Sequence, residues 1–76
     1  MNNKRRSRID KAISHLEPLL DIIRDILSEE QDAYDNLPEN LQDSEKGSVM
    51  EDCIQSLEDA LDSIGEAVSY LEEAKG

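Results

Sequence analysis

The sequence has very few of the residues that build catalytic or metal sites. Its 76 residues include one cysteine, one histidine, two aromatic residues and no tryptophan or phenylalanine. Because Cys53 is the only cysteine, a disulfide within one chain is impossible, and Cys53 with His15 offers too few ligands for zinc. Phosphate-binding loops, nucleophile motifs and Glu-x-x-His pairs are also missing. We therefore expect a protein that is not an enzyme and that binds no metal or cofactor.

Long apolar runs are missing as well. No run approaches the 18 residues that a membrane-spanning helix needs. The basic start Asn-Asn-Lys-Arg-Arg-Ser-Arg is not followed by the apolar core of a signal peptide, since polar residues interrupt the next segment. The sequence therefore predicts no contact with a membrane and a location in the cytoplasm.

Acidic residues dominate the charge and are unevenly distributed. The chain has 19 Asp and Glu against 8 Lys and Arg, for a net charge of −11. Four basic residues lie near the start, at Lys4, Arg5, Arg6 and Arg8, so the rest carries 4 basic and 19 acidic residues, or −15. Such a body should repel nucleic acid. We expect residues 1–7 to form a flexible basic arm that is solvated, pairs with acidic groups, or contacts an anion.

Two segments repeat apolar residues at alternating steps of four and three, which is typical of helices packed along a seam. The first seam has one misfit, Glu30, and comprises Ile9, Ile13, Leu16, Leu20, Ile23, Leu27, Glu30, Tyr34 and Leu37. The second comprises Met50, Ile54, Leu57, Leu61, Ile64, Val68 and Leu71. They predict helices over about 8–36 and 44–74, packed as an all-α antiparallel hairpin that forms a single domain over residues 8–76.

Local signals predict how the first helix begins and bends, and where the second begins. Ser7, with Asp10 three residues later, resembles a capping box, so the first helix should begin near Arg8. Pro18 lacks a backbone donor and should kink this helix. Ser44 is the expected cap of the second helix.

The connection between the segments is expected to be ordered. Pro38 disfavours helix before it, and Asn36 should cap a short turn over Pro38–Leu41. We expect Leu41 to cover the open end of the hairpin. Gly47 falls on the second seam, where a glycine permits close approach, and Tyr34 should lie over it.

Apolar residues beside the seams predict self-association. The columns flanking the two seams are Ala12, Leu19, Ile26 and Ala33, and Cys53, Ala60, Ala67 and Ala74. Small residues permit close packing, so Cys53 is expected to be buried. Together with Ile22, the first column is more apolar than one partner helix can cover. We expect a homodimer that forms a four-helix bundle through Leu19, Ile22, Ile26, Ala60 and Ala67; the alternative is a monomeric hairpin with an apolar edge.

The connection also carries a resemblance to a known group of proteins. Leu37–Gln42 reads Leu-Pro-Glu-Asn-Leu-Gln, Ser44–Gly47 reads Ser-Glu-Lys-Gly, and Leu-Glu-x-Ala occurs at Leu57 and again at Leu71. In these features, half of the chain resembles small acidic helical-hairpin proteins of bacteriophages and prophages of Gram-positive bacteria. The resemblance implies a phage origin and a location in the infected host. It implies no established activity and no functional residues.

We therefore expect a non-enzymatic phage accessory protein that binds a host or phage protein through acidic helices, inhibiting a host defence or regulatory protein. A charge of −15 along a helix of about 45 Å is one per about 3 Å, whereas duplex DNA has one per about 1.7 Å, so only a dimer would mimic DNA. Two alternatives are an oligomer that sequesters a nucleotide signal, using the basic arm with a tyrosine, and a structural or assembly protein of the phage. Candidate partner-contacting residues are Tyr34, Glu39, Asn40, Gln42 and Tyr70.

Overall fold

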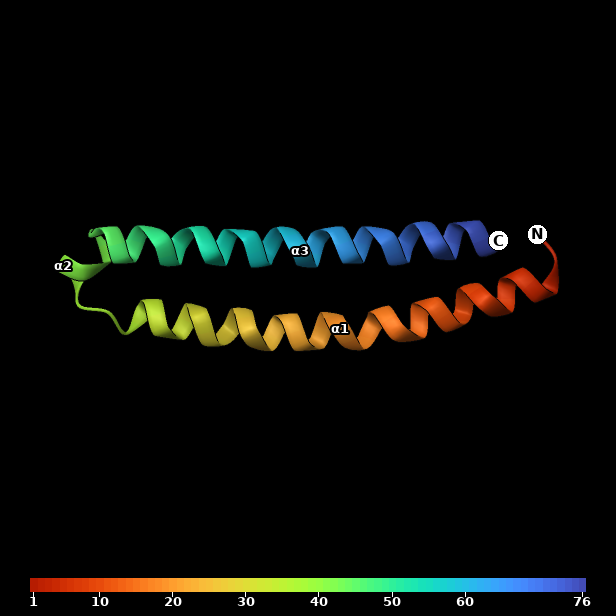
Figure 1. Cartoon of the computed structure of the whole chain (residues 1–76), viewed down its shortest axis with the longest axis horizontal. Helices are drawn as coiled ribbons and strands as arrows, with labels where there is room; N and C mark the ends of the chain where they lie inside the picture. The colour runs from red at the N-terminus through yellow and green to blue at the C-terminus, as the bar shows by residue number, and fades with distance from the viewer.

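Two long helices lie side by side along almost the whole chain. In the computed structural model, which describes residues 1–76, α1 spans Asn3–Asp35, α2 spans Glu39–Gln42 and α3 spans Glu45–Lys75. Helices α1 and α3 run antiparallel, with both termini at one end and α2 at the other (Figure 1). The molecule is a rod 58 Å long and 15 Å by 12 Å across. The predicted all-α helical hairpin is confirmed.

The core is a single seam between α1 and α3. Every residue of the two predicted seams is buried or half-buried, including the misfit Glu30. Only Ile13 and Ile54 are buried apolar side chains, with 6% and 8% of their surface exposed. Two helices alone cannot enclose their side chains, so the hairpin buries one stripe of each helix and leaves the rest of its surface open.

Helix α1 begins earlier than the sequence predicts. It starts at Asn3 rather than near Arg8, because the Asn2 side chain accepts a hydrogen bond from the Arg5 backbone N–H at 2.9 Å. Asparagine is as effective an N-cap as serine, and lysine and arginine are good helix formers. Residues 3–7 are therefore the first turns of α1, and the expectation of a flexible arm there is wrong.

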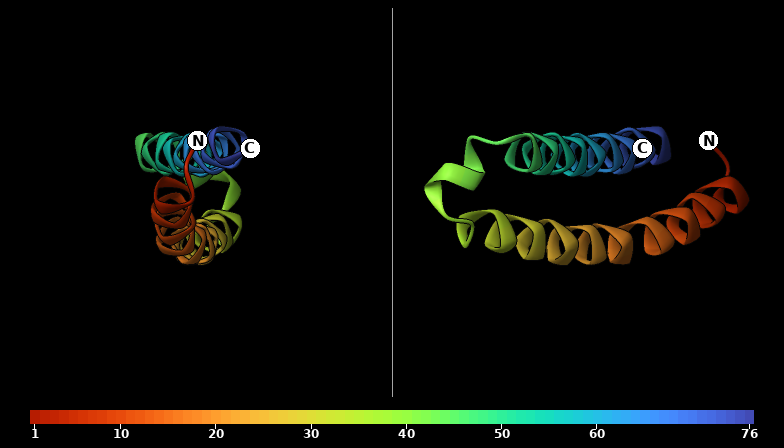
Figure 2. Two further views of the ribbon diagram at one scale, coloured as in Figure 1. Left: turned by 90° about the vertical axis from the view of Figure 1, so that its right-hand side faces the viewer. Right: turned by 60° about the vertical axis from the view of Figure 1, so that its left-hand side comes forward.

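Pro18 bends α1 without interrupting it. The helix is continuous through Pro18, and its N-terminal half curves gradually toward α3 (Figures 1 and 2). Proline leaves the carbonyl four residues before it, that of Ser14, without its usual donor. The Ser14 hydroxyl donates to the Lys11 carbonyl at 2.7 Å in the same stretch. The predicted kink thus takes the form of a smooth bow.

The connection is ordered, but the capping and packing contacts of its residues differ from those predicted. Asn36 is the C-cap of α1 and does not cap α2, whose N-cap Pro38 makes no side-chain hydrogen bond. Leu41 is 38% exposed and does not cover the end of the hairpin. The side-chain amide of Gln42 donates to the carbonyls of Tyr34 and Leu37, at 3.1 and 3.2 Å. These carbonyls lie at the end of α1, where no further helical N–H groups are available as donors. The Gln42 side chain therefore stabilises the turn.

Gly47 is required where α3 passes the connection. The Ser44 hydroxyl accepts from the Gly47 N–H at 3.5 Å, so the predicted cap of α3 is confirmed. Gly47 is buried, and a Cβ built on it would lie 2.0 Å from the backbone oxygen of Gln42. The closest approach to Gly47 is therefore made by the backbone of Gln42. The sequence predicted that the ring of Tyr34 would make it.

The two helical glycines should respond oppositely to alanine. Gly47→Ala forces a backbone shift and should lower the free energy of unfolding by about 1–3 kcal/mol. Gly65→Ala is the matched control, because a Cβ there meets no atom within 4 Å, and it should raise that free energy by about 0.5–1 kcal/mol. Urea unfolding followed by circular dichroism measures both. Equal effects of the two substitutions would contradict the close approach at Gly47.

Candidate interaction surface

The hairpin has two broad faces of different chemistry. Hollows between the helices on one face are lined by Arg24 and Gln31 of α1 and by Glu58 and Gly65 of α3. Repeating these positions every seven residues places further acids on the same side. We call this the acidic face; its acids are Asp10, Glu17, Asp21, Asp32, Asp35, Glu51, Glu58, Asp62, Glu66 and Glu72.

The opposite face carries almost no acid. It comprises the columns on the other side of each seam. On α1 these columns contain Arg8, Ala12, His15, Leu19, Ile22, Ile26, Glu29 and Ala33. On α3 they contain Lys46, Val49, Cys53, Ser56, Ala60, Ser63, Ala67, Tyr70 and Ala74. We call it the acid-poor face. Of the 19 acidic residues, Glu29 alone falls in these columns, and Asp52 borders them, because it lines a hollow with Val49, Cys53 and Ser56.

The acid-poor face combines large side chains from one helix with small ones from the other. Leu19, Ile22 and Ile26 are 44%, 55% and 45% exposed, which is high for large aliphatic side chains. The predicted contact residues Ala60 and Ala67 of α3 are half-buried. Cys53 is exposed, and the expectation that it is buried is wrong, because α1 covers only one side of α3. The result is an apolar strip that the chain itself does not cover.

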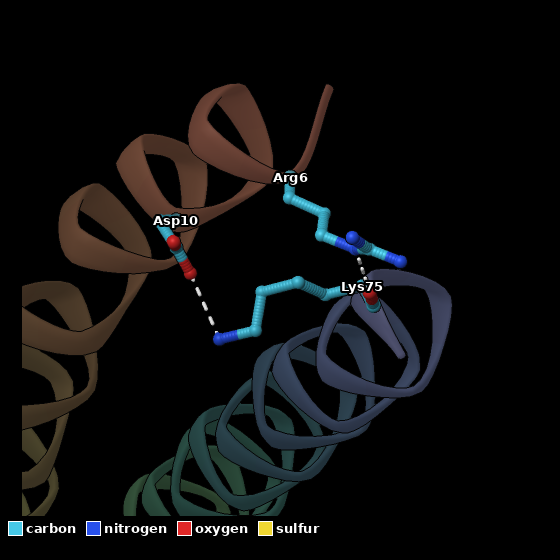
Figure 3. A network of polar contacts seen from close by, with 3 residues as sticks. All are labelled: Arg6, Asp10 and Lys75. Atoms are coloured by element: carbon cyan, nitrogen blue, oxygen red, sulfur yellow. Dashed lines mark hydrogen bonds and ion pairs between the residues drawn. The ribbon is translucent and has the colours of Figure 1, made fainter. Parts of the chain in front are cut away.

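Polar contacts close the hairpin at the termini (Figure 3). Arg6 Nε donates to the Lys75 carbonyl at 2.9 Å, and Lys75 Nζ lies 2.8 Å from Asp10 Oδ1. A cation beside the last carbonyls of α3 is favourable, because those carbonyls lack helical donors. The hydrogen bond that the Lys75 ammonium donates to the Asp10 carboxylate raises the Lys75 pKa above its ordinary value. Of the four basic residues expected to contact an anion, Arg6 is thus held within the chain.

The other three of these four basic residues, Lys4, Arg5 and Arg8, are exposed. Arg5 and Arg8 border a shallow hollow beside Ala12. Tyr70, 66% exposed on α3, lies on the same face. Tyr34 lies at the opposite end of the rod, so one hairpin does not bring it near the basic residues.

Tyr34 closes the other end of the seam. Its hydroxyl donates to the Glu51 carboxylate, which links α1 to the first turns of α3. That hydrogen bond, followed by burial and by the charges of Glu51, Asp43 and Asp35, raises the Tyr34 pKa above 10.0. The sequence predicts a partner-contacting role for Tyr34 and does not predict its contact with Glu51, although Tyr34 lies on the first seam.

The other predicted contact residues lie on the connection. Glu39 and Asn40 of α2 are exposed, whereas Gln42 is half-buried and uses its amide inside the turn.

No group of three or more His, Cys, Asp or Glu side chains is placed to hold a metal ion. Neither long helix contains a stretch apolar enough to cross a membrane. In comparisons with known proteins, no family, no curated protein and no solved structure matches the chain.

The Tyr34 hydrogen bond makes stability depend on pH in the alkaline range. Because the pKa is raised in the folded chain, the contribution is complete below about pH 10 and is lost as the pH rises through the folded value. Tyr34→Phe should therefore lower the urea midpoint at neutral pH, and the difference from the wild type should shrink above pH 10.0.

The matched control is Tyr70→Phe, which removes a hydroxyl from an exposed ring. Urea unfolding of both variants and the wild type across the alkaline range makes the comparison. A deficit of Tyr34→Phe that stays constant with pH, or one shared by Tyr70→Phe, would show that the Glu51 hydrogen bond does not stabilise the fold.

Proposed function

We propose that the chain is a non-enzymatic phage accessory protein that acts as a homodimer and binds a basic surface of a host or phage protein. The observation that carries this proposal is the segregation of charge. Seventeen of 19 acidic residues lie away from the acid-poor face, with Glu29 on it and Asp52 at its border, so two copies can associate there while bringing few acids together. The acids then remain outside the dimer.

The acids are largely free to meet a partner. Only Asp21 and Asp10 form ion pairs within the chain, with Arg24 and Lys75. The other acidic side chains have no cationic partner and are held on rigid helices at regular spacing. Complementary charge of this kind steers association and selects a basic partner.

The charge density supports mimicry of DNA by the dimer. Each chain carries −11, so a dimer carries −22. Over a rod 58 Å long, that is one charge per about 2.6 Å, against one per about 1.7 Å in duplex DNA. A DNA-binding host defence or regulatory protein is therefore the proposed partner, and inhibition is the proposed outcome. The resemblance of the connection to phage proteins supports this setting, in the cytoplasm of an infected bacterium.

Neutralising the acidic face should weaken partner binding. A tagged wild-type chain should retain a stoichiometric protein from a host lysate, with retention falling as salt is added. Glu58→Gln combined with Asp62→Asn removes two charges from the acidic face and should raise the dissociation constant about tenfold, or about 1.4 kcal/mol.

The matched control removes two charges elsewhere on the chain. Asp25→Asn combined with Glu73→Gln leaves both the acidic face and the acid-poor face intact, so it should bind the partner nearly as tightly as the wild type. Equal loss in both double variants would mean that net charge alone acts, and no loss in either would refute binding through this face. Calorimetry with the purified partner gives the dissociation constants.

A further inference from the structure

We infer that two copies pair through the acid-poor face with their connections at opposite ends of the bundle. This arrangement rests on the dimer of the proposed function and specifies its geometry. Three observations carry it: the size and chemistry of the face, the position of its apolar strip along the rod, and the distribution of charge between the ends.

The acid-poor face is large enough for a stable dimer. The hairpin outline is 58 Å by 15 Å, so one broad face presents on the order of 900 Å², close to the roughly 800 Å² that each partner contributes to a standard interface. Its middle is the exposed strip of Leu19, Ile22 and Ile26. A second copy of this chain fits, because the face carries few acids in a protein whose net charge is −11.

The apolar strip lies at the middle of the rod. Tyr34 contacts Glu51 and Asp10 contacts Lys75, so residues of α1 and α3 lie at the same height when their numbers sum to 85. By this rule α1 and α3 overlap over residues 10–35 of α1, whose midpoint falls just after Ile22. A twofold axis there brings Leu19 of one copy level with Ile26 of the other and sets the two Ile22 side chains side by side.

The same axis places α1 against α1 and α3 against α3. By the same rule the axis crosses α3 near residue 62, so Ala60 of one copy lies within one helical turn of Ala67 of the other, and these small residues permit close approach of the two helices. The large residues of α1 pack against one another across the axis. The apolar strip is therefore complementary to itself in this orientation.

Charge decides between the two orientations that the face allows. The half of the rod at the termini, residues 1–22 and 63–76, carries 6 basic and 6 acidic residues. The half at the connection, residues 23–62, carries 2 basic and 13 acidic residues, and therefore the whole net charge of −11. Placing the connections at the same end would set these two −11 halves directly against each other.

The electrostatic repulsion between the two copies differs strongly between the two orientations, because screening weakens it with distance. Neighbouring helices lie 8–10 Å apart, about one screening length at physiological salt. With the connections at opposite ends, each −11 half lies beside a neutral half. The two −11 halves are then displaced by about half the 58 Å length, or between roughly three and four screening lengths. The dimer then presents one strongly acidic region at each end.

Distance measurement between spin labels tests the orientation. Asn40 is exposed on α2, so Asn40→Cys in a Cys53→Ser background places one label at the tip of each hairpin. The inferred arrangement gives a label separation near the 58 Å length of the rod. Connections at the same end would give less than about 30 Å, because a four-helix bundle is only two helix diameters wide. A short distance would overturn the inferred orientation.

The mass in solution tests the face itself. Sedimentation should show the wild type at twice the chain mass of 8.6 kDa. Ile22→Asp should raise the dimer dissociation constant at least about tenfold, because it places an acid at the axis. Ser28→Asp is the control, since Ser28 lies beside Arg24 and Gln31 on the opposite face, and this variant should remain dimeric.

The outcomes separate this inference from the proposed function. A monomeric wild type would overturn the arrangement and the dimer, whether or not a partner is captured. An Ile22→Asp variant that dimerises as tightly as the wild type would overturn the acid-poor face as the interface. A dimer with a long label distance that captures no partner would support the arrangement and refute the binding function. Circular dichroism confirms that each variant is helical.

Discussion

The structure depends on the seam between α1 and α3, because it is the only place where this chain buries apolar surface. Two helices share one stripe each, and only Ile13 and Ile54 become buried apolar residues. A core this thin supplies little stability for a chain of 76 residues. Contacts at the two ends of the hairpin therefore matter more here than in a protein with a full core.

The two ends of the seam are closed by different chemistry. At the termini, Arg6 donates to the Lys75 carbonyl at the end of α3, and the Lys75 ammonium donates to Asp10 of α1. At the connection, the Gln42 amide holds the end of α1, and Gly47 allows the backbone of Gln42 to lie against α3. These contacts set the register of the two helices, and the register in turn determines which exposed residues share a face.

Charge and apolar surface are separated by that register. One side of the hairpin collects acids in repeating positions, and the other collects Leu19, Ile22 and Ile26 with small residues of α3. A protein that binds only through its acids needs no apolar strip, and a monomer gains nothing from leaving one exposed. The two faces together favour an assembly in which the strip is covered and the acids remain accessible.

Much of the fold was predictable from the sequence, because a seven-residue repeat specifies both helix and buried stripe without reference to the rest of the chain. The two seams, the cap at Ser44 and the need for glycine at position 47 follow from such local rules. The helical start at Asn3 did not, because Asn2 and Ser7 are both competent caps and only the folded chain selects one.

The partner of Gly47, the amide contacts of Gln42 and the exposure of Cys53 and Leu41 were decided by the tertiary structure. Each depends on how two distant segments pass one another. The sequence by itself determined that the chain forms two packed helices. Only the tertiary structure decided which side chains lie at the same height on each face, because that height follows from the register between α1 and α3.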